Sequence, residues 1–377
     1  MKIKLVILML FLTAILLTTY IKVVEFVKIK TTNNLHHEVS KQGADNSPQE
    51  HSIQQKPFER NQPRISRIFA WNKKIIVEAE SLFYKLDIST ATAKPVLCPG
   101  RGQLIGLTRK GEEDLALCKV TNGYELFSYN NGDWRLLSVP KDTGLLETTP
   151  IFIADRNNIV LLTENFIFRK SDSGWEKINI SQPSKSFRNF LGERYLLFEN
   201  NLYIGHDEGE WGGGLVCLDI ITGKSRMIAG QEELSGVPIK DLKMDSTGKL
   251  WIVGGIAHSG RKGVISKYSG EKLKILAYNS SNKKQFINWP FEATAFDSLS
   301  FQDQTPYLLT GSMGILKYES GKWEHLTPNW PNVSYVSCLY MLNKDTAIIG
   351  LYDAGVLIWQ LNSNSFTHVN LAESFYY

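Results

Sequence analysis

A short hairpin pattern recurs along this chain of 377 residues. Each copy consists of an apolar strand, a small polar turn and a second strand that opens with an aromatic residue or its substitute. The copies lie at residues 84–97, 127–137, 168–178, 217–228, 266–276, 316–326 and 358–369. Repeats spaced about 45 residues apart are typical of chains in which each repeat forms one four-stranded blade of a β-propeller. The spacing therefore predicts an all-β, seven-bladed β-propeller over residues 65–377.

The complete four-strand unit is clearest in residues 239–276, which read IKDLKMD, then STGKLWIVGG, then GVISKYSG and KLKIL. Short β-branched and aromatic runs separated by Gly, Asn or Asp are typical of strands joined by tight turns. Matching first strands are predicted at 65–71, 102–107, 150–155, 188–193, 294–301 and 334–342. No strand is visibly exchanged between the two ends, although residues 371–377 could add one.

The N-terminal part differs from the rest in composition. Residues 5–21 form an uncharged apolar run inside a lysine-flanked segment. Such a run is at the short end of what spans a bilayer, and no small-residue cleavage site follows it. We expect residues 1–30 to form a hydrophobic helix that acts as a signal-anchor or transmembrane segment, with a cleaved signal and a buried core helix as open alternatives.

Residues 31–64 lack periodicity and are rich in Asn, Gln, Ser and charge, which predicts a disordered linker. The expected arrangement is a single-pass protein of the cell membrane with an extracytoplasmic propeller, and a secreted or periplasmic protein is the alternative. The formal net charge of +4 arises in residues 1–30, which hold five lysines and one glutamate. The propeller is thus balanced in charge, and we expect no nucleic-acid partner.

The chain has four cysteines, and none of them forms a CxxC pair. Cys98 and Cys118 could meet between neighbouring blades, but the sequence does not decide whether they form a disulfide. Cys217 and Cys338 lie in apolar strand patterns, which predicts buried thiols.

Residues 241–255 (DLKMDSTGKLWIVGG) and 263–270 (GVISKYSG) resemble the propeller repeat of two-component regulators. Residues 311–323 (GSMGILKYESGKW) carry the second half of that pattern, whereas 202–205 and 348–351 lack its aspartate turn and its tryptophan. Kelch repeats are the rival resemblance, because Gly254 and Gly255 follow a strand and a tryptophan comes later in several repeats. Either resemblance implies a module that binds ligands or proteins, and neither implies a catalytic residue.

Two loops of adjacent repeats are unusually rich in functional side chains. By the usual winding of a blade, loops between second and third strands share one face with the connections between blades. We hypothesise a ligand-binding site there, because opposite charges and aromatic side chains that converge on one face suit recognition. Its candidate residues are His206, Asp207, Glu208, Glu210 and Trp211 in the first loop, His258, Arg261 and Lys262 in the second, and Trp289 in a following connection.

Three other interpretations of these loops remain open. The loops could simply be solvated, a metal ion could bind the acidic residues, or two carboxylates could catalyse glycoside hydrolysis. Adjacent residues of an extended strand point to opposite faces, which argues against one shared metal ion. We therefore predict no metal, no cofactor and no catalytic residue. The favoured function is binding of an unidentified protein or glycan, and the alternative is an exported propeller hydrolase or lyase that uses the carboxylates of 207–210.

Overall fold

The structure is a computed structural model. It describes residues 63–71, 73–130, 132–142, 145, 149–181, 194–230, 234, 236–257, 260–281, 285–292, 294–328, 330, 335–352 and 355–371. The chain divides into two compact units, Met1–Pro57 and Phe58–Tyr377. The predicted hydrophobic helix (1–30) and all but the last two residues of the predicted linker (31–64) lie outside the described residues, so both stay predictions. No helix within the described ranges is long and apolar enough to cross a bilayer.

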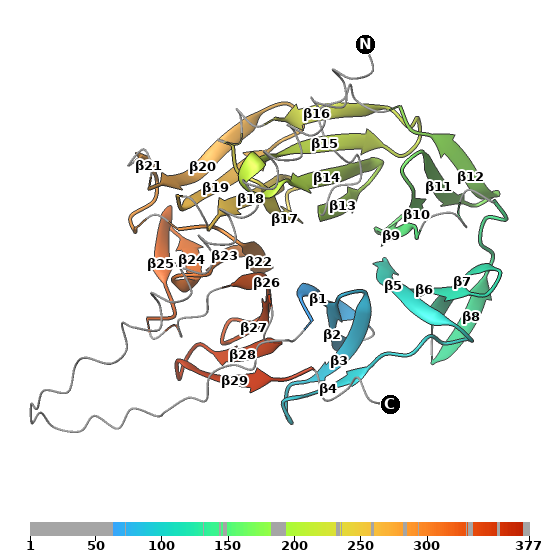
Figure 1. Ribbon diagram of the computed structural model, residues 1–377, viewed down its shortest axis with the longest axis horizontal. Helices are drawn as coiled ribbons and strands as arrows, with labels where there is room; N and C mark the ends of the chain where they lie inside the picture. Colours follow the sequence, from blue (N-terminus) through green and yellow to red (C-terminus); the bar gives the residue numbers. More distant parts are fainter. Residues whose placement is uncertain are drawn as a thin grey trace, which may run out of the picture. The chain divides into compact units, whose positions relative to one another are not determined.

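The described residues form seven antiparallel sheets arranged as the blades of a ring (Figure 1). Blade one contains β1 (Ile65–Trp71), β2 (Lys74–Ala79), β3 (Leu82–Asp87) and β4 (Thr92–Pro95). Blade two contains β5 (Gln103–Lys110), β6 (Glu113–Val120), β7 (Gly123–Asn130) and β8 (Asp133–Leu137). Blade three contains β9 (Ile151–Ala154), β10 (Ile159–Leu162), β11 (Phe166–Ser171) and β12 (Gly174–Asn179).

The other four blades follow in chain order. Blade four contains β13 (Arg194–Phe198), β14 (Asn201–Asp207), β15 (Gly213–Asp219) and β16 (Ser225–Ala229). Blade five contains β17 (Ile239–Met244), β18 (Leu250–Ile256), β19 (Lys262–Tyr268), β20 (Leu273–Ser280) and a short fifth strand, β21 (Gln285–Ile287). Blade six contains β22 (Ser298–Gln302), β23 (Thr305–Thr310), β24 (Gly314–Glu319) and β25 (Lys322–His325), and blade seven contains β26 (Val336–Asn343), β27 (Thr346–Leu351), β28 (Val356–Gln360) and β29 (Ser365–Val369).

This architecture confirms the predicted seven-bladed β-propeller, with one strand misplaced. The first strand of blade four was predicted at 188–193, but β13 spans Arg194–Phe198. The two-residue turn Glu199–Asn200 joins β13 to β14, and Glu199 has a φ of 55°. A two-residue hairpin turn needs positive φ, which is uncommon for glutamate, so this turn lacks the glycine typical of such hairpins.

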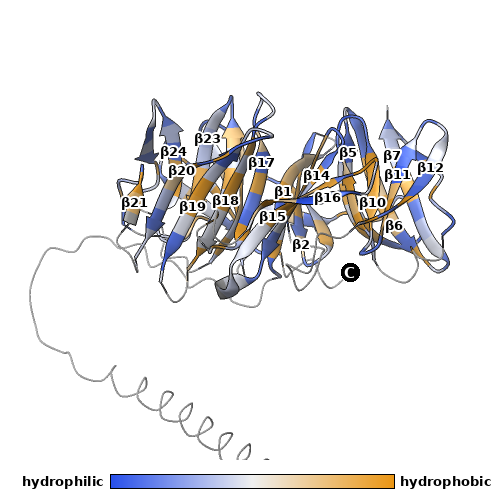
Figure 2. Ribbon diagram, turned by 90° about the horizontal axis from the view of Figure 1, so that it is seen from above, coloured by the Kyte–Doolittle hydropathy of each residue, from blue (hydrophilic) through white to orange (hydrophobic). Residues whose placement is uncertain are grey.

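Apolar residues lie along the strands, and hydrophilic residues are concentrated at their ends (Figure 2). Side chains from neighbouring blades form shared core clusters. The ring of Trp134 in blade two stacks on Trp71 in blade one at 5.7 Å between centroids. Trp323 in blade six lies 6.2 Å from Trp289, which follows blade five. In blades two and six, the aromatic residue of the repeated hairpin therefore packs between blades.

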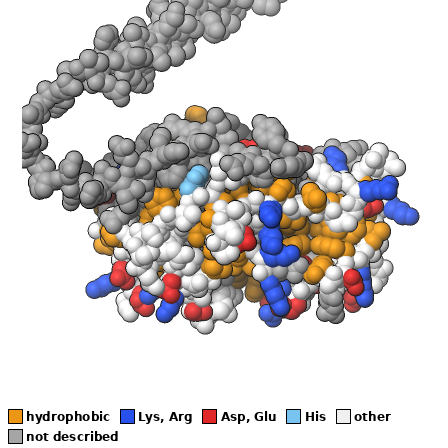
Figure 3. All heavy atoms as spheres, turned by 90° about the horizontal axis from the view of Figure 1, so that it is seen from below, with side chains coloured by type: hydrophobic (Ala, Val, Ile, Leu, Met, Phe, Trp, Pro, Cys, Tyr) orange, Lys and Arg blue, Asp and Glu red, His pale blue; other side chains and the backbone are white. Residues whose placement is uncertain are grey.

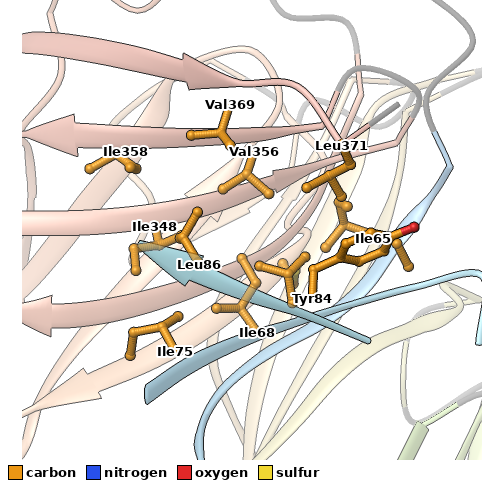
Figure 4. Close-up of a cluster of buried hydrophobic side chains, with 13 residues drawn as sticks. Ile65, Ile68, Ile75, Tyr84, Leu86, Ile348, Val356, Ile358, Val369 and Leu371 are labelled. Carbon is orange, nitrogen blue, oxygen red and sulfur yellow. The ribbon is translucent and has the colours of Figure 1, made fainter. Parts of the chain in front are cut away.

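The ring closes where blade seven meets blade one. Strands β1 to β3 and β26 to β29 supply one buried apolar cluster, which Figure 4 shows. Ile65, Ile348 and Leu371 are fully buried in this cluster. Blades one and seven each complete their sheet from their own strands, and within the described ranges no strand is exchanged between them. Closure therefore rests on side-chain packing.

The strand order gives the ring two different faces. The turn face carries the connections from first to second strand and from third to fourth strand of each blade. The loop face carries the second-to-third loops and the connections between blades. The chain enters β1 through Pro63 and Arg64 on the loop face, because β1 is a first strand.

A disulfide joins Cys98 to Cys118. Cys98 lies in the connection between blades one and two, and Cys118 lies in β6. Cys217 and Cys338 are buried free thiols, as predicted. The disulfide settles a pairing that the sequence left open.

Candidate functional site

The loop between β14 and β15 forms one turn of 3-10 helix, η2 (Gly209–Trp211). The Asp207 carboxylate accepts a hydrogen bond from the Gly209 N–H at 3.1 Å. The Trp211 N–H donates to the Glu208 carbonyl at 3.2 Å, and Gly209 and Gly212 both have positive φ. These interactions hold Trp211 at the tip of the loop, where it is 71% exposed.

His206 and Asp207 diverge because consecutive strand residues point to opposite faces of the sheet. His206 is 3% exposed, and burial lowers the pKa of its imidazole to about 4. Asp207 instead forms an ion pair with Lys240 of β17, with 2.5 Å between Oδ2 and Nζ. The two residues therefore do not act on one ligand from the same side.

Lys240 reaches Asp207 because of a local irregularity in its strand. The pairing of β17 with β18 contains a bulge between Ile239 and Asp241, and Lys240 is the extra residue. Bulges re-aim side chains, and here the bulge turns a lysine of blade five toward a carboxylate of blade four. The Lys240 carbonyl also accepts a hydrogen bond from Arg194 Nε of β13, at 2.5 Å. Two charged contacts thus join blades four and five next to the predicted loop.

A second carboxylate, Asp297, belongs to the same group of charges. It lies directly before β22 and accepts a hydrogen bond from the Gly311 N–H at 2.9 Å. Burial raises the pKa of Asp297 to about 7, the nearby Lys240 charge and the Gly311 bond oppose this rise, and the Asp207 charge adds to it. Asp207, Lys240 and Asp297, which we call the inner charge cluster, bring together blades four, five and six at the loop-face ends of their strands.

Sequence reasoning found Asp207 and missed Lys240 and Asp297. Both missed residues lie where the connection between two blades meets a first strand, in the segments PIKDLKMD and TAFDSLSF. A charged residue at the start of a first strand is the signal that could have revealed them.

The other predicted residues differ in how far the structure describes and exposes them. Glu208 is partly exposed at the start of the blade-four loop, and Glu210 lies in η2, its side chain outside the description. Arg261 is exposed in the blade-five loop, Lys262 is the first residue of β19 and is partly exposed, and His258 lies outside the described residues.

Trp289 is 5% exposed and lies inside the protein. Its ring packs against Phe296 at 4.5 Å between centroids, and its Nε1–H donates to the Glu292 carbonyl at 3.0 Å. The structure therefore places Trp289 in the packing between blades five and six and not on the loop face.

Large exposed apolar side chains are concentrated on the loop face. Seven of the ten that occur among the described residues lie at or next to its loops: Leu82, Leu97, Trp211, Phe286, Ile287, Tyr335 and Tyr352. The turn face carries polar turns such as 155–158 (DRNN) and 245–249 (DSTGK). Figure 3 shows charged side chains gathered along one edge of the ring. Contiguous exposed apolar surface is typical of interaction sites, which makes the loop face the candidate binding face.

Within the described ranges, no three His, Cys, Asp or Glu residues gather in a way that could hold a metal ion. The Asp207 carboxylate is engaged by Lys240 and by the Gly209 N–H. The described part of the blade-four loop therefore offers exposed aromatic surface more than free acid or base groups.

The comparisons with known proteins agree with this fold. No protein-family model and no curated protein matches the chain. A solved structure described as YCF48 bound to D1 peptide is similar over 82% of this chain and 97% of its own, with 13% identity and a TM-score of 0.51.

Two further structures are similar. YCF48 from Cyanidioschyzon merolae matches over 81% of this chain and 97% of its own, with 13% identity and a TM-score of 0.50. The extracellular domain of a hybrid two-component system from B. thetaiotaomicron matches over 79% of this chain and 40% of its own, with 13% identity and a TM-score of 0.46. None of these likenesses confirms the kelch alternative. At this identity the two YCF48 structures show a shared fold and nothing further.

Proposed function

We propose that this protein is a membrane-tethered, extracytoplasmic β-propeller that binds a segment of another protein through the loop face of blades four and five. The observation that carries the proposal is Trp211, which is held in an ordered turn and is nevertheless 71% exposed. Exposing a large aromatic ring costs hydrophobic free energy, and aromatic anchors dominate the binding energy of interfaces. The proposed site residues are Trp211, Asp207, Glu208, Glu210, His258, Arg261 and Lys262.

The inner charge cluster lies next to this anchor. Its Asp207–Lys240 ion pair joins blades four and five at the base of the loop and so helps to hold Trp211 in place. A propeller of similar fold, YCF48, has been described bound to D1 peptide, which favours a protein segment over a glycan as the ligand.

The disulfide supports the extracytoplasmic location. Disulfides persist in oxidising compartments and are rare where thiols are kept reduced. The Cys98–Cys118 bond fits export, and the apolar run 5–21 supplies a candidate export signal and anchor. Carbonate extraction of membranes, followed by N-terminal sequencing of the protein, separates an anchored chain from a cleaved, secreted one.

The experiment that tests the binding site compares Trp211→Ala with two control variants. Ligands are first selected with the full chain from a peptide display library and a glycan array, and their affinities are then measured by calorimetry. Trp211→Ala should weaken peptide binding by about 2 kcal/mol or more, roughly thirtyfold, with an unchanged melting temperature. Ile221→Ala, an exposed residue of a turn-face loop, should change neither quantity.

Trp323→Ala serves as the control for folding. Trp323 is buried between blades, so its loss should lower the free energy of unfolding by about 3–5 kcal/mol. If Trp211→Ala is destabilised to the same degree, Trp211 is a packing residue and the proposed site is wrong. If only glycans are selected, the ligand is a sugar and not a protein segment. If every selected ligand binds independently of Trp211, this loop is not the binding site.

A further inference from the structure

A second group of exposed apolar residues lies on the loop face, away from Trp211. Tyr335 precedes β26, Tyr352 follows β27, Leu82 begins β3 and Leu97 follows β4. All four are exposed, and Leu97 is 81% exposed. They belong to blades one and seven and to the connections that lead into and out of them, so we call them the seam patch.

Part of the seam patch is ordered by direct contacts. The Tyr352 N–H donates to the Tyr335 carbonyl at 3.1 Å, and the two rings lie 6.2 Å apart between centroids. The Arg64 guanidinium lies 4.6 Å from the centroid of the Tyr352 ring, and the Arg64 N–H donates to Glu80 Oε1 at 3.3 Å. The aromatic pair is thus fixed in an exposed position by three chain segments.

The seam patch adjoins the point where the chain enters the ring. Arg64, in contact with Tyr352, is one residue before β1, and the chain that precedes it includes the apolar run 5–21. A segment that enters a bilayer would therefore leave the propeller beside this patch and not beside the turn face.

The chemistry of the seam patch matches that of a membrane interface. Tyrosine is enriched where hydrocarbon meets water, because its ring is apolar and its hydroxyl is polar. Arg64 and the exposed Arg101, in the connection between blades one and two, are positively charged, with Glu80 next to Arg64 and Glu125 next to Gly100. Basic residues near a bilayer are attracted to anionic lipids.

From this placement we propose that the seam patch rests on the lipid bilayer surface, with Leu97, Tyr335 and Tyr352 in the headgroup region. Blades one and seven then face the membrane, and the blade-four loop with Trp211 stays accessible to its ligand. This inference rests on the tethered propeller of the proposed function, but it does not depend on the identity of the protein ligand. It also assigns the exposed tyrosines a role that the ligand site leaves unexplained.

The test measures which parts of the ring approach lipid. Single cysteines are introduced into the full chain by Leu97→Cys, Tyr352→Cys, Trp211→Cys and Ile221→Cys and are labelled with an environment-sensitive fluorophore. The native cysteines do not interfere, because two form the disulfide and two are buried. Each labelled protein is reconstituted with phosphatidylcholine vesicles that contain phosphatidylglycerol and a headgroup-labelled or a doxyl-labelled quencher lipid. Thermal melts verify that every variant is folded.

The expected result is several-fold stronger quenching, with a blue-shifted emission, at Leu97 and Tyr352 than at Ile221 and Trp211. Equal quenching at Leu97 and Ile221 would overturn the proposal. Quenching at Trp211 as strong as at Leu97 would overturn the proposal that blades one and seven, and not blade four, face the membrane. The labels at Leu97 and Tyr352 could also be shielded from a water-soluble quencher without being reached by the lipid quenchers. That result would show that protein covers the patch, and it would overturn the proposal as well. None of these outcomes affects ligand binding measured with Trp211→Ala, so the two proposals fail separately.

Discussion

His206 and Asp297 are buried titratable residues, and burial shifts their pKa values in opposite directions. Burial penalises the charged form, so it lowers the pKa of His206 to about 4 and raises the pKa of Asp297 to about 7. In an unfolded chain their pKa values are about 6.5 and 3.9. Both residues are therefore neutral in the folded protein across much of the mildly acidic range.

The two residues should give opposite pH dependences of stability. Between about pH 4 and 6.5 the unfolded state binds a proton at His206 that the native state does not, so this residue makes the free energy of unfolding rise with pH. Between about pH 4 and 7 the native state holds a proton on Asp297 that the unfolded state has lost, so this residue makes the free energy of unfolding fall as the pH rises.

Urea unfolding of His206→Gln and Asp297→Asn from pH 4 to 7.5 measures these dependences. Relative to the wild type, His206→Gln should lose stability mainly at the high end of the range, and Asp297→Asn should gain mainly there. Parallel curves for the wild type and both variants would contradict the assignment.

At this scale, the composition of the blade-four loop could be read from the sequence, but the surroundings of each of its side chains could not. The cluster 206–211 stands out by composition, and the structure holds Trp211 exposed there. The alternation of a strand buries His206 and turns Asp207 toward Lys240, a partner 33 residues away. The sequence predicts an exposed loop position for Trp289, but contacts from blade six cover this side chain. Sequence patterns of this kind do not show which residues far apart in the chain come into contact.

Strands were predicted well where the repeat motif contains its own stabilising contacts. In blade five the Asp245 carboxylate accepts hydrogen bonds from the Thr247 and Lys249 N–H groups and from Trp251 Nε1–H at 2.9 Å. The aspartate, turn and tryptophan of the motif therefore form one local unit. In blade four a turn with Glu199 at positive φ replaces that unit, and there the predicted first strand was misplaced. β21 was also not foreseen, because it spans only three residues.

The disulfide is the covalent link between a connection on the loop face and a neighbouring strand. It joins Cys98 to Cys118 of β6 across a sequence separation of 20 residues. Closing a loop of this length lowers the entropy of the unfolded chain and is worth about 3 kcal/mol. The double variant Cys98→Ser/Cys118→Ser should lose that amount in denaturant unfolding. Dithiothreitol should destabilise the wild type to a similar extent and leave the double variant unchanged; an equal effect of the reductant on both proteins would refute the assignment.

The ring as a whole has six interfaces between blades that follow each other in the chain and one interface between its ends. At the six, a connection of the main chain joins the two blades. At the seam between blades seven and one, the described residues contribute side-chain packing around Ile65, Ile348 and Leu371 and the contact of Arg64 with the Tyr352 ring. Opening of the seam breaks noncovalent contacts alone, whereas every other pair of neighbouring blades stays joined by the main chain. We therefore expect the seam to open before any other interface.

Two matched isoleucine substitutions test this order. Ile348 in the seam cluster and Ile252 in the cluster between blades four and five are both fully buried in second strands. Each change to alanine removes the same atoms and should lower the global free energy of unfolding by about 2–5 kcal/mol.

Native-state hydrogen exchange should then distinguish the two variants. In Ile348→Ala, the amides of β1 and β26 should exchange faster than those of β13 and β17, because opening of the seam requires less free energy than global unfolding. In Ile252→Ala the connection between blades four and five restrains the interface, so exchange in β13 and β17 should follow global stability. If both variants accelerate the same amides equally, the seam is no weaker than the other interfaces, and the unfolding of the ring is cooperative throughout.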